Sequence, residues 1–63
     1  MTGNQLQAAL DQVGLSQRKA GPFLGVHDRT VRHWIADDQP VPEAVAKLLR
    51  LMIRLHISPE EAT

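Results

Sequence analysis

The stretch that decides the fold is residues 15–35, LSQRKAGPFLGVHDRTVRHWI. It contains two short helical patterns joined by Gly25-Val26. At about 100° of rotation per residue, the second pattern has one apolar side and one basic side. The apolar side carries Val31, Trp34 and Ile35, and the basic side carries Arg29, Arg32 and His33. We expect the first side to pack on a core and the second to be free to touch phosphates and base edges.

Length and composition limit the class of protein. A chain of 63 residues is expected to form one domain, 1–63, near the lower size at which a core without disulfides or metal outweighs chain entropy. Cysteine is absent, which is compatible with a reducing compartment. The start, Thr2-Gly3-Asn4-Gln5, is polar, and no apolar run approaches the ~20 residues of a membrane span. We therefore expect a cytoplasmic protein with no membrane contact.

Charge is unevenly distributed along the chain. The net charge is zero and the pI is about 6.8, which argues against binding nucleic acid by bulk electrostatics. Between residues 16 and 34, however, one acidic residue, Asp28, accompanies four basic ones, which are Arg18, Lys19, Arg29 and Arg32. A local basic surface on a neutral protein is one interpretation. The other is an ordinary solvated helix face.

The first helix has clear start and end signals. Thr2 followed by Gln5 has the form of a capping box, and apolar residues then recur at helical spacing. Gly14 suits the position just after a helix, where the backbone commonly adopts a left-handed conformation. The pattern predicts a helix over Gly3–Val13.

The second helix contains a proline. Ser16 can cap it and Gly25 can end it, with Ala20, Gly21, Phe23 and Leu24 pointing inward. Pro22 lacks an N–H, and its ring crowds the carbonyl of Arg18, four residues back. Because Pro22 falls on the outward face, we expect a kinked or partly 3₁₀ first turn rather than loss of the helix.

Two further helices and a short fifth are predicted. A third helix is predicted over about 28–36, with Asp28 or His27 as its cap, and for the Asp28 side chain capping is favoured over a contact with a base. A fourth opens with Pro42 in its first turn and Glu43 near its positive end, and continues to about His56. Residues 58–61 again have helix-start chemistry, so a short fifth helix either frays or is supported from elsewhere. The predicted fold class is all-α, a compact bundle of four to five helices.

The fourth helix carries more apolar surface than one small core needs. Its predicted core stripe is Val45, Leu48, Leu49, Met52 and Leu55, with Leu51 and Ile53 on the flanks. This arc spans roughly 200°, against about 100° for a helix that covers one core. The surplus predicts self-association, with an interface formed by Leu51, Ile53, Leu55 and Ile57. The alternative is that the bundle or the last residues of the chain wrap this helix.

The region 14–42, together with its flanking helices, resembles the helix-turn-helix proteins of the Cro and phage-repressor class, of XRE type. The residues that carry the resemblance are Gln17, Ala20, Gly21, Gly25, Val26, Val31 and Trp34, followed by a proline-containing loop. Two helices that cross over a short turn need small residues where their backbones meet, which Ala20-Gly21 supplies. Pro22, His27 and the neutral charge depart from the usual pattern. The resemblance implies a lambda-repressor-like bundle with the helix-turn-helix proper at about 16–36.

The resemblance also implies roles for individual residues. The third helix would enter the major groove of double-stranded DNA, and the second would cross the backbone. Base contacts would come from Arg29, Arg32, His33 and Asp28, and phosphate contacts from Gln17, Arg18, Thr30 and Ser16. Arginine bound to guanine O6 and N7 is worth about 1 to 3 kcal/mol of discrimination. The structural alternatives are a solvated charge for each arginine and for His33, a capping role for Asp28 and a core position for Trp34.

The expected function is a sequence-specific transcriptional regulator, a small bacterial or phage repressor. One such domain reads only a few base pairs, so a homodimer on half-sites about 34 Å apart is expected. The alternative is a protein-interaction module of the same fold, antitoxin-like or a phage assembly adaptor, that binds an unknown partner through the apolar flank of the fourth helix.

Other kinds of chemistry are not indicated. His27, His33 and His56 lack the i,i+3 or i,i+4 spacing of two metal ligands on one helix face. A serine nucleophile at Ser16 or Ser58 has no glycine-rich oxyanion or phosphate loop beside it. We expect neither an enzyme nor a metal or cofactor site.

Overall fold

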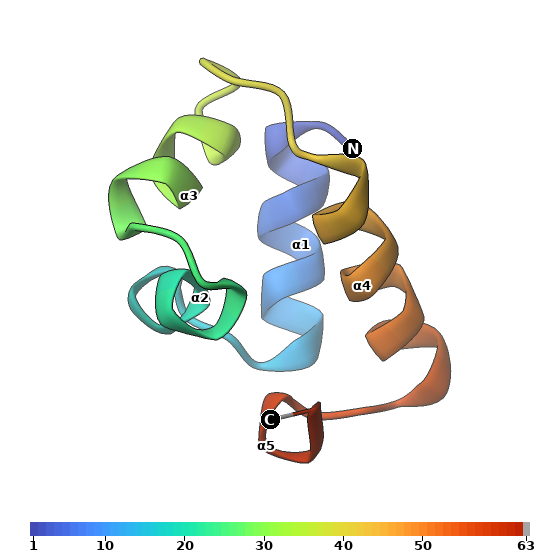
Figure 1. The fold of residues 1–63 in the computed structure, drawn as a ribbon. Helices are drawn as coiled ribbons and strands as arrows, with labels where there is room; N and C mark the ends of the chain where they lie inside the picture. Colours follow the sequence, from blue (N-terminus) through green and yellow to red (C-terminus); the bar gives the residue numbers. More distant parts are fainter. Residues whose placement is uncertain (63) are drawn as a thin grey trace.

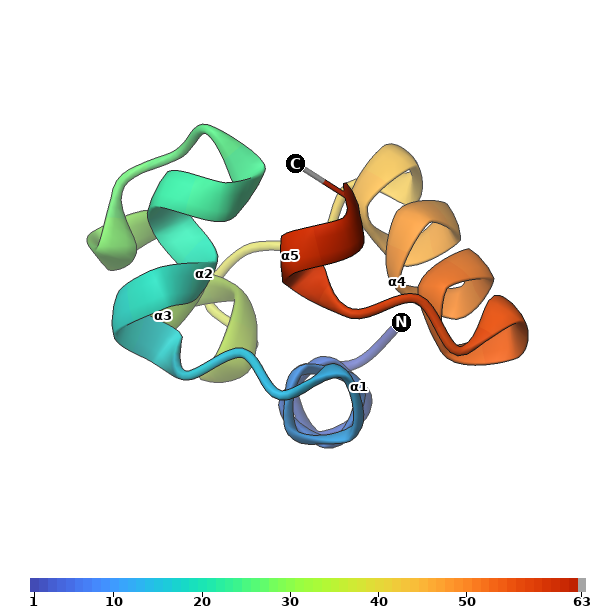
Figure 2. The same cartoon turned by 90° about the horizontal axis from the view of Figure 1, so that it is seen from below.

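The computed structural model describes residues 1–62 and is all-helical over that range. Five helices follow one another, α1 (Gly3–Val13), α2 (Gln17–Leu24), α3 (Asp28–Ile35), α4 (Glu43–Leu55) and α5 (Pro59–Ala62). Helix α1 lies between the α2–α3 pair on one side and α4 on the other (Figure 1). The view along α1 shows α5 between these two sides (Figure 2). The predicted fold class, a compact helical bundle that contains a helix-turn-helix, is confirmed.

Both ends of α1 form as the sequence predicts. The N–H of Gln5 donates to Thr2 Oγ1 at 3.2 Å, and the N–H of Thr2 donates to Gln5 Oε1 at 2.8 Å, so the capping box is complete. Gly14 ends the helix with φ of 80°, in the left-handed region that glycine adopts without a Cβ penalty. These local signals need no tertiary contact, which is why a sequence pattern predicts them correctly.

Helix α2 keeps its proline, Pro22, inside a continuous helix. Ser16 Oγ accepts from the N–H of Lys19 at 3.3 Å, and Gly25 closes the helix with φ of 76°. The helix survives as predicted and is α-helical from Gln17 to Leu24, and its first turn contains one i→i+3 bond of 3₁₀ type, in which the N–H of Lys19 donates to the Ser16 carbonyl oxygen at 3.1 Å. Pro22 and Arg18 are both exposed, so water can satisfy the carbonyl that the proline leaves without a donor.

The cap of α3 is His27 and not Asp28. The backbone of His27 is extended and its side chain makes no capping hydrogen bond, while Asp28 is the first helical residue. Of the two predicted caps, His27 is confirmed, and the capping role favoured for the Asp28 side chain is wrong, because the helix begins one residue earlier than a capping Asp28 requires. Asp28 still lies in the first turn, where a carboxylate interacts favourably with the helix dipole.

The core forms where α1 meets the other helices. Trp34 is 5% exposed, so its indole belongs to the core and is not available to stack on a base. The buried apolar residues are Leu6, Ala9, Leu10, Val13, Leu15, Ala20, Val31, Trp34, Val41, Ala46, Leu49 and Met52.

Helix α4 is rotated relative to the predicted core stripe. Its buried residues are Ala46, Leu49 and Met52. Leu48 and Leu55, both predicted inside, are 38% and 56% exposed, and Leu51 is 51% exposed. The small side chain of Ala46 is completely buried and allows α4 to approach the rest of the bundle closely. A count of large apolar residues therefore gives the wrong orientation for this helix.

A contact between distant segments ties the start of α1 to the end of α3. The N–H of Gly3 donates to Asp37 Oδ1 at 2.8 Å, across 34 residues of sequence. A Cβ at residue 3 would overlap the carbonyl oxygen of Ile35 and lie 2.9 Å from that of Trp34. Asp37 itself has φ of 62°. The loop after α3 is thus fixed on α1 by a glycine that permits close backbone approach.

His56 ends α4 in a conformation that disfavours an L side chain, with φ of 55°. We expect His56→Gly to raise the free energy of unfolding by about 0.5 to 1 kcal/mol, because glycine removes the left-handed strain at the expense of some unfolded-state entropy. Denaturant unfolding measures the change. His56→Ala is the control, since it removes the same imidazole but keeps the Cβ. Equal stabilities for the two variants would contradict the strain argument.

Candidate nucleic-acid interface

Helix α3 presents one buried and one exposed face, as the sequence predicts. Val31 and Trp34 face the core. Asp28, Arg29 and Arg32 are exposed on the outside. The two faces alternate at helical spacing, so the core contacts that hold α3 in place also fix the direction in which its polar side chains project.

The crossing of α2 and α3 depends on two small residues. Ala20 is fully buried, and Gly21 is buried against the turn. A Cβ on Gly21 would lie 2.8 Å from the carbonyl oxygen of Val26 and 3.1 Å from the backbone nitrogen of Asp28. The predicted role of Ala20-Gly21 at the crossing is confirmed, and it is Gly21 that sets the position at which α3 begins.

We expect Gly21→Ala to displace α3 and to lower the free energy of unfolding by about 1 to 3 kcal/mol, because the added methyl meets backbone that can only move as a unit. Denaturant unfolding and amide chemical shifts along α3 measure the two effects. Gly25→Ala is the control, because an alanine there would strain the left-handed backbone but its Cβ would contact nothing. Wild-type shifts along α3 in the Gly21→Ala protein would contradict this account of the crossing.

Arg29 and Arg32 are the most available donors on α3. Both side chains are exposed, and within residues 1–62 neither has an ion-pair partner. They border a surface hollow of about 380 Å³ at the start of α3, which is lined by His27, Asp28, Arg29, Thr30 and Arg32. Each guanidinium offers several N–H groups in a planar fork that matches two acceptors at once, as on a guanine edge or a phosphate.

His33 is less free than the two arginines. Its Nδ1 lies 3.3 Å from Asp38 Oδ2, where it can donate to the carboxylate of the loop that follows α3. Its side chain is 42% exposed. Thr30 is half-buried on the flank of the same helix. Sequence reasoning placed both on the interface and did not detect the pairing of His33 with Asp38.

The start of α2 is tied to α1 by exposed polar side chains. Gln17 Nε2 donates to Gln7 Oε1 at 3.0 Å, and Gln7 Nε2 donates to Asp11 Oδ1 at 3.1 Å. Ser16 is occupied by its capping bond, and Arg18 is exposed. Gln7 is a residue that sequence reasoning missed. Its i,i+4 spacing to Asp11 was the only available signal, and the contact with Gln17 is tertiary.

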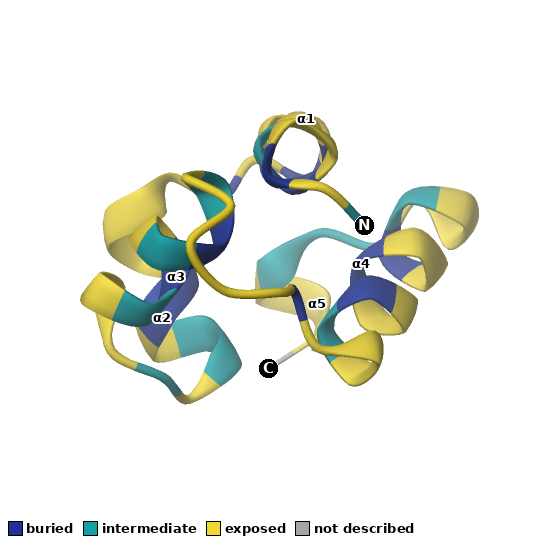
Figure 3. Cartoon of the chain, turned by 90° about the horizontal axis from the view of Figure 1, so that it is seen from above, coloured by how far each residue is buried: buried dark blue, intermediate teal, exposed yellow. Residues whose placement is uncertain are grey.

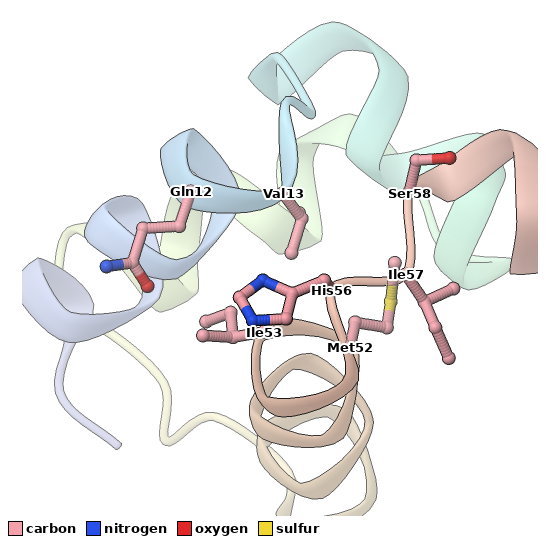
Figure 4. Close-up of a pocket in the computed structure, with 7 residues that line it drawn as sticks. All are labelled: Gln12, Val13, Met52, Ile53, His56, Ile57 and Ser58. Carbon is pink, nitrogen blue, oxygen red and sulfur yellow. The ribbon is translucent and has the colours of Figure 1, made fainter.

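The four residues predicted for a dimer interface divide into two pairs. Leu51 and Leu55 are exposed on α4. Ile53 and Ile57 instead pack against the core and line a cavity of about 390 Å³ between the ends of α1 and α4 (Figure 4). The remaining lining residues are Gln12, Val13, Met52, His56 and Ser58. The structure therefore does not place all four on one outer surface.

Among residues 1–62, no three His, Cys, Asp or Glu side chains come together as ligands for a metal ion. None of the helices in this range is long and apolar enough to cross a membrane.

The fold and its exposed basic helix define a small helix-turn-helix bundle. Two curated relatives, both described as transcriptional repressor protein KorC of Escherichia coli, are 37% identical to this chain over 51 residues. The alignment covers 76% of this chain and 60% of the relative, so the chain spans about 60% of the length of the proteins it matches. No family model matches the chain. No solved structure matches it either.

Proposed function

We propose that this chain is a sequence-specific DNA-binding transcriptional regulator that reads the major groove with α3. The observation that carries the proposal is the pair of exposed arginines, Arg29 and Arg32, on the face of α3 opposite the buried Val31 and Trp34. The similarity to transcriptional repressors supports the same role. In this proposal the chain 1–63 acts as one DNA-binding domain, with its helix-turn-helix at about 16–36.

The proposed docking follows from the placement of the two helices. With α3 in the groove, Arg29 and Arg32 contact base edges, and Asp28 and Thr30 lie beside them at the start of the helix. Helix α2 crosses the backbone, where Arg18 and the backbone N–H groups of the first turn approach phosphates. Gln17 also contacts a phosphate, with a side chain that its hydrogen bond to Gln7 already orients. His33 reaches DNA only through the ring nitrogen that does not face Asp38.

Selection of bound sites from a pool of random duplexes, at two salt concentrations, tests this function. We expect enrichment of a motif that contains guanines, with weaker binding at the higher salt because phosphate contacts release counterions. The motif is expected to be palindromic, because two copies of a domain with this small footprint are needed for useful affinity. Folded protein that enriches no sequence even at low salt would contradict the proposal.

A second candidate function is a protein-interaction module of the same fold. The exposed leucines of α4 and the neutral net charge are the observations that favour it. Such a module would bind its partner through α4 and would be indifferent to the loss of Arg29 and Arg32. The site selection separates the two functions, because only a DNA reader enriches a sequence.

A further inference from the structure

The turn that ends α3 folds the chain back over the last turn of that helix. The N–H of Asp38 donates to the carbonyl oxygen of His33 at 2.9 Å, and the N–H of Asp37 donates to that of Trp34 at 3.2 Å. Asp37 itself is left-handed, with φ of 62°. Two such bonds around a left-handed residue form a Schellman motif, which closes the last carbonyl groups of a helix. As a result Asp38 lies beside His33, five residues earlier in the chain.

The side chain of Asp38 makes a second contact with the same residue. Its Oδ2 lies 3.3 Å from Nδ1 of His33. An ionised carboxylate can only accept a hydrogen bond, so in this pair Nδ1 carries the hydrogen. The turn is fixed from its other side as well, because Asp37 Oδ1 accepts from the N–H of Gly3 at 2.8 Å. The imidazole is therefore held at Nδ1 by a loop that the start of α1 anchors.

The other ring nitrogen of His33, Nε2, is the one left for DNA. The side chain of His33 is 42% exposed. The loop residues 36–40, which hold its ring, are themselves exposed (Figure 3). In a neutral imidazole one nitrogen carries the hydrogen and the other accepts, so Nε2 is an acceptor here. Arg29, one helical turn before His33, and Arg32 carry donors only. His33 thus adds an acceptor to the α3 surface, beside the donors of the two arginines.

We infer that Asp38 is a positioning residue that makes His33 an acceptor for the amino group of a base. In the major groove the amino donors are N4 of cytosine and N6 of adenine, whereas guanine offers only the acceptors N7 and O6. The opposite tautomer would present a donor at Nε2 and would favour guanine. Asp38 therefore decides which bases His33 reads, although it does not touch DNA itself. The DNA contact rests on the proposed function, whereas the tautomer of His33 is a property of the chain alone.

Nitrogen-15 spectra of the histidine rings test the positioning role without DNA. The two neutral tautomers differ in which ring nitrogen carries the hydrogen, so each has its own pair of nitrogen shifts. At about pH 8, where free histidine is largely neutral, we expect the hydrogen on Nδ1 of His33 in the wild type and largely on Nε2 after Asp38→Ala. Glu43→Ala is the control, since it removes the same charge from the exposed start of α4. A wild-type ring with its hydrogen on Nε2, or a tautomer that Asp38→Ala leaves unchanged, would overturn the inference.

Selection of bound duplexes at the same pH tests the base preference. We expect the wild type to favour cytosine or adenine over guanine at one position of its motif by about fivefold, the worth of a single hydrogen bond. His33→Ala identifies that position by losing the preference there, and Asp38→Ala is expected to shift it toward guanine. The Glu43→Ala protein is expected to keep the wild-type preference. Circular dichroism checks the fold of each variant, and Asp38→Ala retains the backbone N–H that closes the turn.

The outcomes separate this inference from the proposed function. A wild-type motif that neither His33→Ala nor Asp38→Ala alters at any position would overturn the inference and leave the proposed function standing. A wild-type protein that enriches no sequence would contradict the proposed function, and the reading of a base by His33 would fall with it even if the tautomer is as expected.

Discussion

Replacing Arg29 and Arg32 together by alanine is expected to abolish sequence-specific DNA binding without unfolding the chain. A well-placed arginine at a guanine edge is worth about 1 to 3 kcal/mol, so losing two weakens binding by about 30-fold to more than 10⁴-fold. Both side chains are exposed and have no ion-pair partner among residues 1–62, so little stability is lost with them. Fluorescence anisotropy with a selected duplex measures the binding, and circular dichroism measures the fold.

The control for this experiment removes the same charge from another surface. Arg50 and Arg54 are exposed on α4, and their double replacement by alanine changes the net charge equally. We expect this protein to keep its sequence preference and to lose only a small, salt-sensitive part of its affinity. Equal losses of DNA affinity in the two double variants would mean that the chain binds DNA through its basic residues in general and not through α3.

Gly3→Ala is expected to remove most of the stability of the domain, even though alanine favours helices. The added Cβ would overlap the Ile35 carbonyl oxygen, so α1 has to move away from the end of α3, and the 2.8 Å bond to Asp37 is then strained or broken. Overpacking against backbone costs about 3 kcal/mol in severe cases, while a core of this size supplies about 3 to 5 kcal/mol in total. Thermal and denaturant unfolding measure the loss.

A neighbouring substitution separates crowding from helix propensity. Asn4 is exposed on the same turn of α1, and Asn4→Ala is expected to leave stability unchanged or raise it by a few tenths of a kcal/mol. If Gly3→Ala behaved like Asn4→Ala, the close approach of α1 to the end of α3 would not exist in solution.

The features that were predictable from the sequence are those set by neighbouring residues. The capping box of Thr2 and Gln5, the left-handed glycines at 14 and 25 and the faces of α3 depend on spacing along the chain. The small pair at the α2–α3 crossing was also predictable, because the geometry of two helices joined by a short turn requires it.

The features that were missed depend on residues far apart in the sequence. Nothing in the pattern links Gly3 to Asp37, or Gln7 to Gln17, until the helices are packed. On α4, Leu49 and Met52 were correctly predicted inside, but Leu48 and Leu55 were not, because the apolar arc is wider than the core and several rotations of the helix satisfy the pattern. Packing selected the one that buries Ala46 and leaves Leu48 and Leu55 outside.

The central claim is that α3 is the surface that meets DNA, and amide chemical shifts of labelled protein titrated with a short duplex test it most directly. We predict that the largest changes fall on residues 28–33 and on the first turn of α2, and that the exposed residues of α4 change little. Changes confined to α4, or no change at low salt, would contradict the claim and favour a protein-interaction module.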